Sequence, residues 1–290
     1  MFAFWFFIQQ VMASINIGPL SFSMPLLGTL IAMAVGLFTA AWQDRRHHTR
    51  SESLLTRLLV LAMVAGRAGF VVQHLDSYLA SPLAMLDIRD GGFSVLISLA
   101  VFLVGVGAMA WRRQPLRRPL LISSVAGLCV LGIVYALMHL YGPQQGKPVE
   151  NIELHDLDGQ RININDFQGK PAVVNLWATW CPPCRREMPV LAESQQANPH
   201  INYVFANQRE TAETIRDYLR EENIDLDNIL IDDRGKLAQV IKSNGLPTTL
   251  FLDKQGRLVD VRLGELSRAT LQDRVQALSR GDQTPLPVQE

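Results

Sequence analysis

Two cysteines separated by two residues are the clearest chemical feature of this chain. Cys181 and Cys184 lie in the segment WATWCPPC, residues 177–184. Two intervening residues place the second sulfur within reach of a disulfide and leave the first available to a partner. Such C-x-x-C pairs can also lower the pKa of their first thiol well below that of a free cysteine. The spacing therefore indicates thiol–disulfide exchange.

The elements on either side of the pair suit this chemistry. The apolar run at 172–178 predicts a buried strand, and residues 182–196 predict a helix. At such a junction the free backbone N–H groups and the positive end of the helix dipole stabilise a thiolate. Pro182 and Pro183 fit the first helical positions, because proline has no N–H to lose there and its φ is preset.

A zinc site is the competing interpretation of the cysteine pair, and it requires about four ligands. The third and last cysteine, Cys129, lies in a long apolar stretch, and the histidines nearest in sequence are His155 and His200. We therefore favour redox chemistry and expect neither a metal ion nor another cofactor.

The pattern of short apolar runs and amphipathic segments continues beyond the cysteines. Further strands are predicted at 201–207, 228–231, 248–253 and 256–264, and further helices at 211–222, 235–244 and 267–278. Strands that alternate with helices predict an α/β sheet, with the last two strands as an antiparallel edge.

Charged residues are distributed unevenly along the 290 residues. Residues 1–146 hold ten Lys and Arg and five Asp and Glu, whereas residues 147–290 hold 17 and 22. A soluble domain is about 25% charged, which fits the second half alone and indicates two domains. The apolar content of 48% excludes a disordered chain. Three cysteines are too few for a disulfide-stapled miniprotein, and no strongly basic patch supports nucleic-acid binding.

Four apolar stretches of the first half have the length of transmembrane helices, about 20 residues each. They run over about 20–42, 58–74, 90–112 and 118–147. We expect the opening ten residues, MFAFWFFIQQ, to form an interfacial helix. A cleavable signal peptide is not expected, because no Lys or Arg precedes the apolar region.

The basic loops predict the orientation of these spans. Arginines follow the first and third spans: Arg45, Arg46, Arg50, Arg112, Arg113, Arg117 and Arg118. The positive-inside rule places both loops in the cytoplasm, so the chain after Tyr141 is expected in the periplasm of a bacterium with a multi-pass inner-membrane anchor. We divide the chain into a transmembrane domain at 1–142, a linker at 143–149, a soluble domain at 150–282 and a tail at 283–290.

Residues 15–100 resemble the N-terminal part of prolipoprotein diacylglyceryl transferases. The resemblance lies in INIGPLSFSMPLLGTLIAMAVGLF, GRAGFVV and LDSYLASPLAMLDIRDGGFS. That family follows its Gly-Gly-Leu-Ser segment with His-Gly-Gly, whereas GGFS at 91–94 is followed here by VLI. The resemblance implies a shared membrane scaffold, and the missing His-Gly-Gly argues against lipid transfer. Arg67, inside the second span, then has either a lipid-headgroup role or, as we favour, a structural pair with Asp76 or a backbone carbonyl.

The segments NLWATWCPPCRREMP and GLPTTLFLDKQGRLV resemble the thioredoxin fold, and more narrowly the TlpA/ResA/DsbE-like membrane-tethered thiol–disulfide oxidoreductases. The resemblance covers about residues 148–280. It implies that Cys181 is the attacking cysteine, that Cys184 resolves, and that the two form a redox-active disulfide. It also implies that Pro247 is the cis-proline that lies against this disulfide.

The same resemblance draws attention to residues around the pair. Asn175 stands where ordinary thioredoxins carry a buried acid, and Glu187 matches an acidic residue of the ResA-like members. A carboxylate there would accept or relay the proton of Cys184 and raise thiol pKa values; the alternative is a solvent-facing helix glutamate. Trp177 and Trp180 suit packing and surface shaping, because tryptophan has one N–H and no titratable group.

Together these features predict a membrane-anchored periplasmic oxidoreductase that reduces disulfide-bearing proteins. The membrane half holds one cysteine, too few for a transmembrane dithiol relay, so we expect a separate electron donor. By resemblance this donor is a DsbD- or CcdA-like membrane protein. An apocytochrome c in cytochrome c biogenesis, a metallochaperone and other thiol proteins remain open as substrates. The alternatives are a diacylglyceryl transferase-related protein, a thiol oxidase and a non-catalytic binding or chaperone module.

Overall fold

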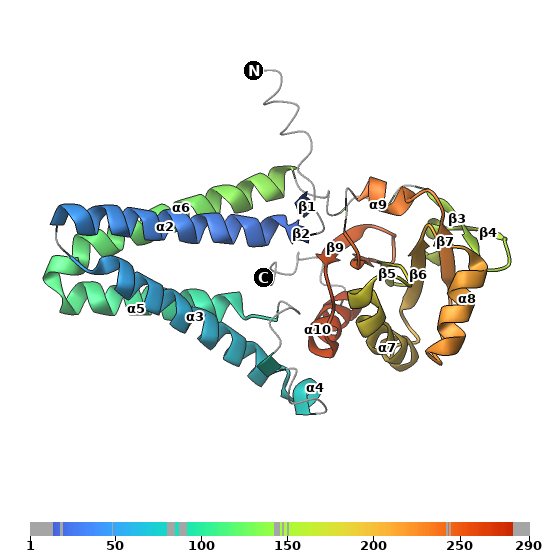
Figure 1. Ribbon diagram of the computed structural model, residues 1–290. Helices are drawn as coiled ribbons and strands as arrows, with labels where there is room; N and C mark the ends of the chain where they lie inside the picture. Colours follow the sequence, from blue (N-terminus) through green and yellow to red (C-terminus); the bar gives the residue numbers. More distant parts are fainter. Residues whose placement is uncertain are drawn as a thin grey trace, which may run out of the picture. The chain divides into compact units, whose positions relative to one another are not determined.

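The computed structural model divides the chain into two compact units, which are described separately (Figure 1). Met24–Tyr141 make up most of one unit and Gly142–Leu286 most of the other. The structure describes residues 14–17, 20–47, 49–79, 85–86, 92–141, 146, 148–149, 151–241, 243 and 245–280. The interfacial helix predicted at the N-terminus and the tail at 283–290 lie outside these residues.

The helical unit contains four helices that are long and apolar enough to cross a membrane. They are α2 (Met24–His47), α3 (Ser51–Gln73), α5 (Val95–Arg112) and α6 (Arg117–Tyr141). The short helix α4 (Leu75–Leu79) and the 3-10 turn η3 (Gln114–Leu116) lie between them. Within the unit, α2 packs mainly on α6, and α3 on α5. The prediction of four long apolar helices is confirmed.

The first span begins later than we predicted. Leu20–Ser23 form a strand, β2, that pairs antiparallel with β1 (Ser14–Ile17), and the helix starts only at Met24. The sequence LSFS alternates polar and apolar residues with the period of a strand. Gly18-Pro19, a dipeptide typical of turns, separates the two strands in the sequence. The first residues of the apolar run that we predict as a helix therefore belong to a pair of strands.

Small residues allow α2 and α6 to approach closely. A Cβ atom added at Gly127 would meet the carbonyl oxygen of Ala32 at 3.1 Å. Small residues at helix contacts are the usual way in which membrane helices bring their backbones together. A polar contact accompanies this one, because Gln43 Nε2 donates to Ser123 Oγ over 3.3 Å.

Arg67 has structural partners within the helical unit. Its Nε donates to the carbonyl oxygen of Met85 over 3.0 Å, and its Nη1 donates to that of Gly92 over 2.8 Å. The guanidinium also lies over the ring of Tyr78, 5.4 Å from its centroid. Backbone carbonyls therefore stabilise this buried charge, which agrees with the structural interpretation of Arg67.

The second unit is built on a sheet of seven strands in the order β4-β3-β7-β6-β5-β8-β9. The strands are β3 (Glu153–Asp156), β4 (Arg161–Asn163), β5 (Ala172–Trp177), β6 (Asn202–Gln208), β7 (Ile229–Asp232), β8 (Thr248–Leu252) and β9 (Leu258–Leu263). β5, β6 and β7 run parallel, and β8 pairs antiparallel with both β5 and β9. This confirms the α/β sheet with its antiparallel edge.

Two strands and one helix differ from our expectation. β3 and β4 were not predicted, because they are only four and three residues long and their sequences ELHD and RIN show little alternation. Helix α9 covers Lys236–Val240, shorter than the predicted 235–244. It stops before the sequence Ser243-Asn244-Gly245, whose residue types favour turns over helix interiors.

Four helices cover the two faces of the sheet (Figure 1). α7 (Pro182–Ala197), α8 (Ala212–Glu221) and α10 (Arg268–Ser279) pack on one face, and α9 packs on the other. Strand β5 is buried along its whole length, because it lies between β6 and β8 and under helices on both faces. The loop that leaves β5 toward Cys181 therefore starts from the best-packed strand of the unit.

Candidate active site

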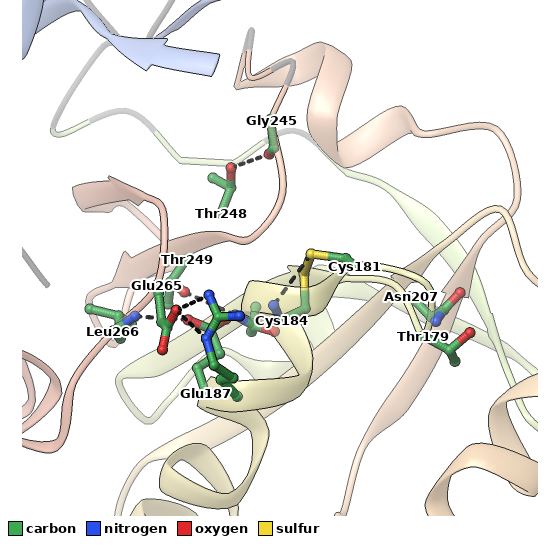
Figure 2. The surroundings of a disulfide bond; sticks show 12 residues. Thr179, Cys181, Cys184, Glu187, Asn207, Gly245, Thr248, Thr249, Glu265 and Leu266 are labelled. Carbon is green, nitrogen blue, oxygen red and sulfur yellow. Dashed lines mark hydrogen bonds and ion pairs between the residues drawn. A yellow bond between two sulfur atoms is a disulfide. The ribbon is translucent and has the colours of Figure 1, made fainter. Parts of the chain in front are cut away.

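The cysteine pair forms a disulfide at the start of α7 (Figure 2). The S–S distance is 2.08 Å and the Cα atoms lie 5.3 Å apart. Cys181 is the residue that caps the helix, Pro182 and Pro183 occupy its first positions, and the N–H of Cys184 donates to Cys181 Sγ over 3.3 Å. A thiolate at Cys181 would accept a hydrogen bond from this N–H and would lie at the positive end of the helix dipole. Both interactions stabilise its charge.

The two sulfur-bearing residues differ little in exposure, but their surroundings differ. Cys184 is fully buried and Cys181 keeps 3% of its surface, while the neighbouring Trp180 is 67% exposed. Pro182 is exposed as well. A partner molecule therefore reaches Cys181 only at a small opening, and Trp180 and Pro182 form the adjacent surface.

Glu187 lies one helical turn beyond Cys184 and is fully buried. Its Oε1 accepts from Asn175 Nδ2 over 2.8 Å, and its Oε2 accepts from the backbone N–H of Leu266 over 2.9 Å (Figure 2). The alternative of a solvent-facing glutamate is therefore wrong. The face of α7 that carries Glu187 packs against the sheet and against the loop that precedes α10.

Burial has a large effect on the acidity of this carboxyl. It raises the pKa of Glu187 to about 8, because the charged form loses its hydration, and the hydrogen bonds from Leu266 and Asn175 oppose this shift only in part. Among nearby charges, Glu265 raises the pKa and Arg262 lowers it. Near neutral pH the acid form of Glu187 therefore predominates over a minority of carboxylate, and the group lies close to the disulfide (Figure 2).

Asn175 links the carboxyl of Glu187 to a second strand, β8. It lies on β5 opposite Thr249 of β8, and its Nδ2 also donates to Thr249 Oγ1 over 3.0 Å. The Oδ1 atom of Asn175 is buried and has no hydrogen-bond partner among the residues that the structure describes. The carboxyl of Glu187 therefore bonds directly to Asn175 on β5 and to the loop at Leu266, and Asn175 links it further to β8. These three segments are distant in sequence.

Pro247 lies beside the end of β5 that leads to the cysteines. β8 runs antiparallel to β5 with Thr248 opposite Leu176, so the residue before β8 is at this end. The peptide bond between Leu246 and Pro247 is cis. The hydroxyl of Thr248 donates to the carbonyl oxygen of Gly245 over 2.7 Å and thereby holds the loop that carries the proline (Figure 2).

Glu210 holds the other side of the cysteine loop, and the sequence analysis did not single it out. Its carboxylate accepts from the N–H of Thr179 over 2.7 Å, from Thr179 Oγ1 over 2.5 Å and from Asn207 Nδ2 over 2.7 Å. The sequence could have indicated Glu210, because loops that follow neighbouring parallel strands meet at one sheet edge. Near the end of β6, Asn207 lies opposite Trp177, the last residue of β5, so the loop after β6 had to lie beside Cys181.

The two arginines after the motif are each matched by a glutamate. Arg186 Nη2 lies 2.6 Å from Glu265 Oε2, and Arg185 pairs with Glu222. All four side chains are partly exposed, and exposed pairs contribute little to stability. Their effect is to leave no unpaired positive charge at these two positions beside the motif.

Among the residues that the structure describes, no group of three or more His, Cys, Asp or Glu side chains is arranged to hold a metal ion.

Comparison with known proteins places these features in context. Residues 145–261 match the model of the AhpC/TSA family. A thiol-disulfide oxidoreductase ResA of Bacillus cereus is 28% identical over 138 residues, which are 47% of this chain and 79% of the relative. A ResA of Bacillus subtilis is 25% identical over 160 residues, 53% of this chain and 89% of the relative. The thioredoxin-like protein YneN of Bacillus subtilis is 30% identical over 163 residues, 52% of this chain and 95% of the relative.

Proposed function

This chain belongs to the thioredoxin-like family and is a thiol–disulfide oxidoreductase, and we propose that it reduces protein disulfides through Cys181 and Cys184. The observation that carries the proposal is the Cys181–Cys184 disulfide at the N-terminus of α7, next to a buried carboxyl. A structural disulfide needs neither the helix dipole nor a titratable partner, whereas a dithiol that exchanges electrons benefits from both.

The proposed reaction transfers two electrons from the dithiol to the substrate. The Cys181 thiolate attacks one sulfur of a substrate disulfide, forms a mixed disulfide and releases the other substrate sulfur as a thiolate. Cys184 then loses its proton and attacks Cys181 Sγ, which restores the Cys181–Cys184 bond and releases the second substrate thiolate. Two protons pass from the dithiol, by way of Glu187 or solvent, to the two substrate thiolates.

The carboxylate form of Glu187 is the proposed proton acceptor for Cys184. Cys184 and Glu187 are both fully buried on the same helix, so the thiol of Cys184 has little access to water. A carboxyl whose pKa is raised to about 8 is matched to a thiol more closely than an ordinary glutamate is, and matched pKa values favour proton transfer. Pro247, at the same end of the sheet, is the proposed support for the substrate backbone, with Trp180, Pro182 and Pro183 around the opening.

A separate dithiol must return the protein to its reduced form. The helical unit holds only Cys129, and a dithiol relay across a membrane needs at least two cysteines. We therefore assign this step to an integral membrane protein of the DsbD or CcdA type, which supplies two electrons by the same exchange chemistry.

Four apolar helices suggest a membrane anchor for this enzyme. We propose that they place the thioredoxin-like unit in the periplasm of a bacterial inner membrane, because arginines gather at the ends of α2 and α5 and in the segments that follow these helices. The scaffold shared with diacylglyceryl transferases is part of this proposal, as an anchor without lipid transfer.

The full chain in lipid nanodiscs should accelerate the reduction of insulin disulfides by dithiothreitol. The Cys129→Ser variant is the matched control and should be equally active, because Cys129 lies in α6, in the separate helical unit. Turbidity from the released insulin B chain measures the rate. A rate equal to the uncatalysed background, with the Cys181–Cys184 disulfide still open to reduction, would mean a non-catalytic module.

The proposed orientation has its own test. In intact spheroplasts, a membrane-impermeant maleimide should label reduced Cys181 in a Cys129→Ser background as fully as it does after lysis, because the thioredoxin-like unit is outside the cytoplasm. A cysteine placed in the loop after α5 by Gln114→Cys should react only after lysis. Labelling of Cys181 that requires lysis contradicts the orientation.

A further inference from the structure

The two ends of the Asn175 side-chain amide differ in their hydrogen bonding. Both of its N–H groups have acceptors, Glu187 Oε1 at 2.8 Å and Thr249 Oγ1 at 3.0 Å. Its carbonyl Oδ1 is buried and, within the described part of the chain, has no hydrogen-bond partner. Most buried polar atoms are hydrogen-bonded, and each exception calls for an explanation. The unbonded atom here belongs to Asn175, the residue that donates to the carboxyl of Glu187, whose pKa is raised.

The contacts of Glu187 fit its ionised form. Oε1 accepts from Asn175, and Oε2 accepts from the backbone N–H of Leu266. A backbone N–H can only donate, so Oε2 must remain an acceptor whether or not the carboxyl carries a proton. A proton on Glu187 therefore belongs on Oε1, where it faces an N–H group of Asn175 and lacks an acceptor.

Thr249 allows the amide of Asn175 to adopt the opposite orientation. A hydroxyl can donate as well as accept, so Thr249 Oγ1 can bond to Asn175 Nδ2 or, after the amide has turned, to its Oδ1. The terminal torsion of an asparagine is broad and roughly two-fold. After a half turn, Oδ1 takes the position of Nδ2 and accepts both from Thr249 and from a protonated Oε1.

We propose that Asn175 is a positioning residue whose amide turns over when Glu187 gains or loses its proton. Its NH₂ group faces the carboxylate and its carbonyl faces the carboxylic acid, so Oε1 has a fitting partner in both states. The step moves one proton onto or off Oε1 and no electrons. This inference rests on the proposed function, because it describes how the proton acceptor of Cys184 is kept ready for use.

The other groups around Glu187 do not replace this contact. On its own helix, Arg186 is paired with Glu265 of the loop before α10, and Cys184 is in the disulfide. The charge of Arg262 on β9 lowers the pKa of Glu187, opposite to the effect of Glu265. β5 and β8 present the neutral side chains of Asn175 and Thr249, and of these two only Asn175 bonds to the carboxyl.

The test follows both groups by NMR in the oxidised full chain in nanodiscs, with ¹⁵N-labelled asparagine side chains and ¹³C-labelled glutamate carboxyls. The Asn175 NH₂ signal is assigned by its loss in Asn175→Asp. We expect this signal to shift with pH at the same midpoint as the carboxyl of Glu187. Asn175→Leu, which removes the N–H donor to the carboxylate, should raise the pKa of Glu187 by about one pH unit or more.

Asn207→Leu is the matched control, because Asn207 is equally buried and its amide bonds to a different carboxylate, that of Glu210. It should leave the midpoint of Glu187 unchanged. An Asn175 NH₂ signal that does not respond while Glu187 titrates would overturn the proposal, as would an unchanged Glu187 pKa in Asn175→Leu. The wild-type titration decides the matter even where Asn175→Leu does not fold. No substrate is turned over, so this result is independent of whether the enzyme is a reductase.

Discussion

Cys181→Ser is expected to reduce disulfide reduction to the uncatalysed background. The thiolate is the nucleophile in thiol–disulfide exchange, and a serine hydroxyl at the helix N-terminus has no accessible ionised form at neutral pH. The variant should also form no mixed disulfide with substrates, because the sulfur that joins them is absent. Its measurement is the insulin assay in nanodiscs, together with non-reducing electrophoresis of membranes that contain the variant.

Cys184→Ser is expected to behave differently although its turnover is also lost. Cys181 still attacks, but nothing resolves the mixed disulfide, so substrates accumulate in covalent complexes that dithiothreitol releases. Mass spectrometry of these complexes identifies the substrates, with Cys129→Ser as the background for both variants. Equal trapping by Cys181→Ser and Cys184→Ser would mean that the roles of the two cysteines are assigned wrongly.

Glu187→Gln is expected to produce the second large effect, a fall in the reduction rate of roughly 10²-fold, the lower end of the range for general acid–base catalysis. Glutamine keeps the shape and the acceptor oxygen for Leu266 but cannot take the proton of Cys184. Burial raises the pKa of Glu187 to about 8, so its negative charge is present mainly above that pH. In the thiol alkylation curve the upper part should therefore move to lower pH by about one unit. The two thiols and the carboxyl titrate as a coupled system, and the whole curve is compared.

The stability of the same variant gives a measurement that does not depend on catalysis. The pKa of Glu187 rises from 4.5 to about 8 on folding, so the folded protein keeps a proton that the unfolded chain loses. This contribution to stability is fully present below about pH 4.5 and is lost as pH rises toward 8. Between these values the free energy of unfolding should fall by about 1.4 kcal/mol per pH unit relative to Glu187→Gln. Parallel pH dependences for the two proteins would show that Glu187 is ionised in the fold.

The features that were predicted correctly depend on residues close together in the chain. The length of an apolar run is enough to predict a transmembrane helix, and four such runs became four helices. The prolines after Cys181 mark a helix start, and the pair Cys181 and Cys184 lies at that start. Alternating strands and helices were sufficient for the α/β sheet, whereas β3, β4 and the strand pair β1 and β2 have patterns too short or too mixed to be distinguished locally.

The surroundings of the disulfide depend on contacts between distant segments, and these were not predictable from local pattern. Whether Glu187 faced solvent or the core depended on where α7 rests on the sheet. Its partners come from β5 and from the loop at Leu266, 12 and 79 residues away. Asn175 meets Thr249 only because β8 is placed antiparallel beside β5, and Glu210 reaches Thr179 only because β6 ends beside it. A carboxyl's pKa follows from its burial and its neighbours, so the acidity of Glu187 exists only once these segments are packed together.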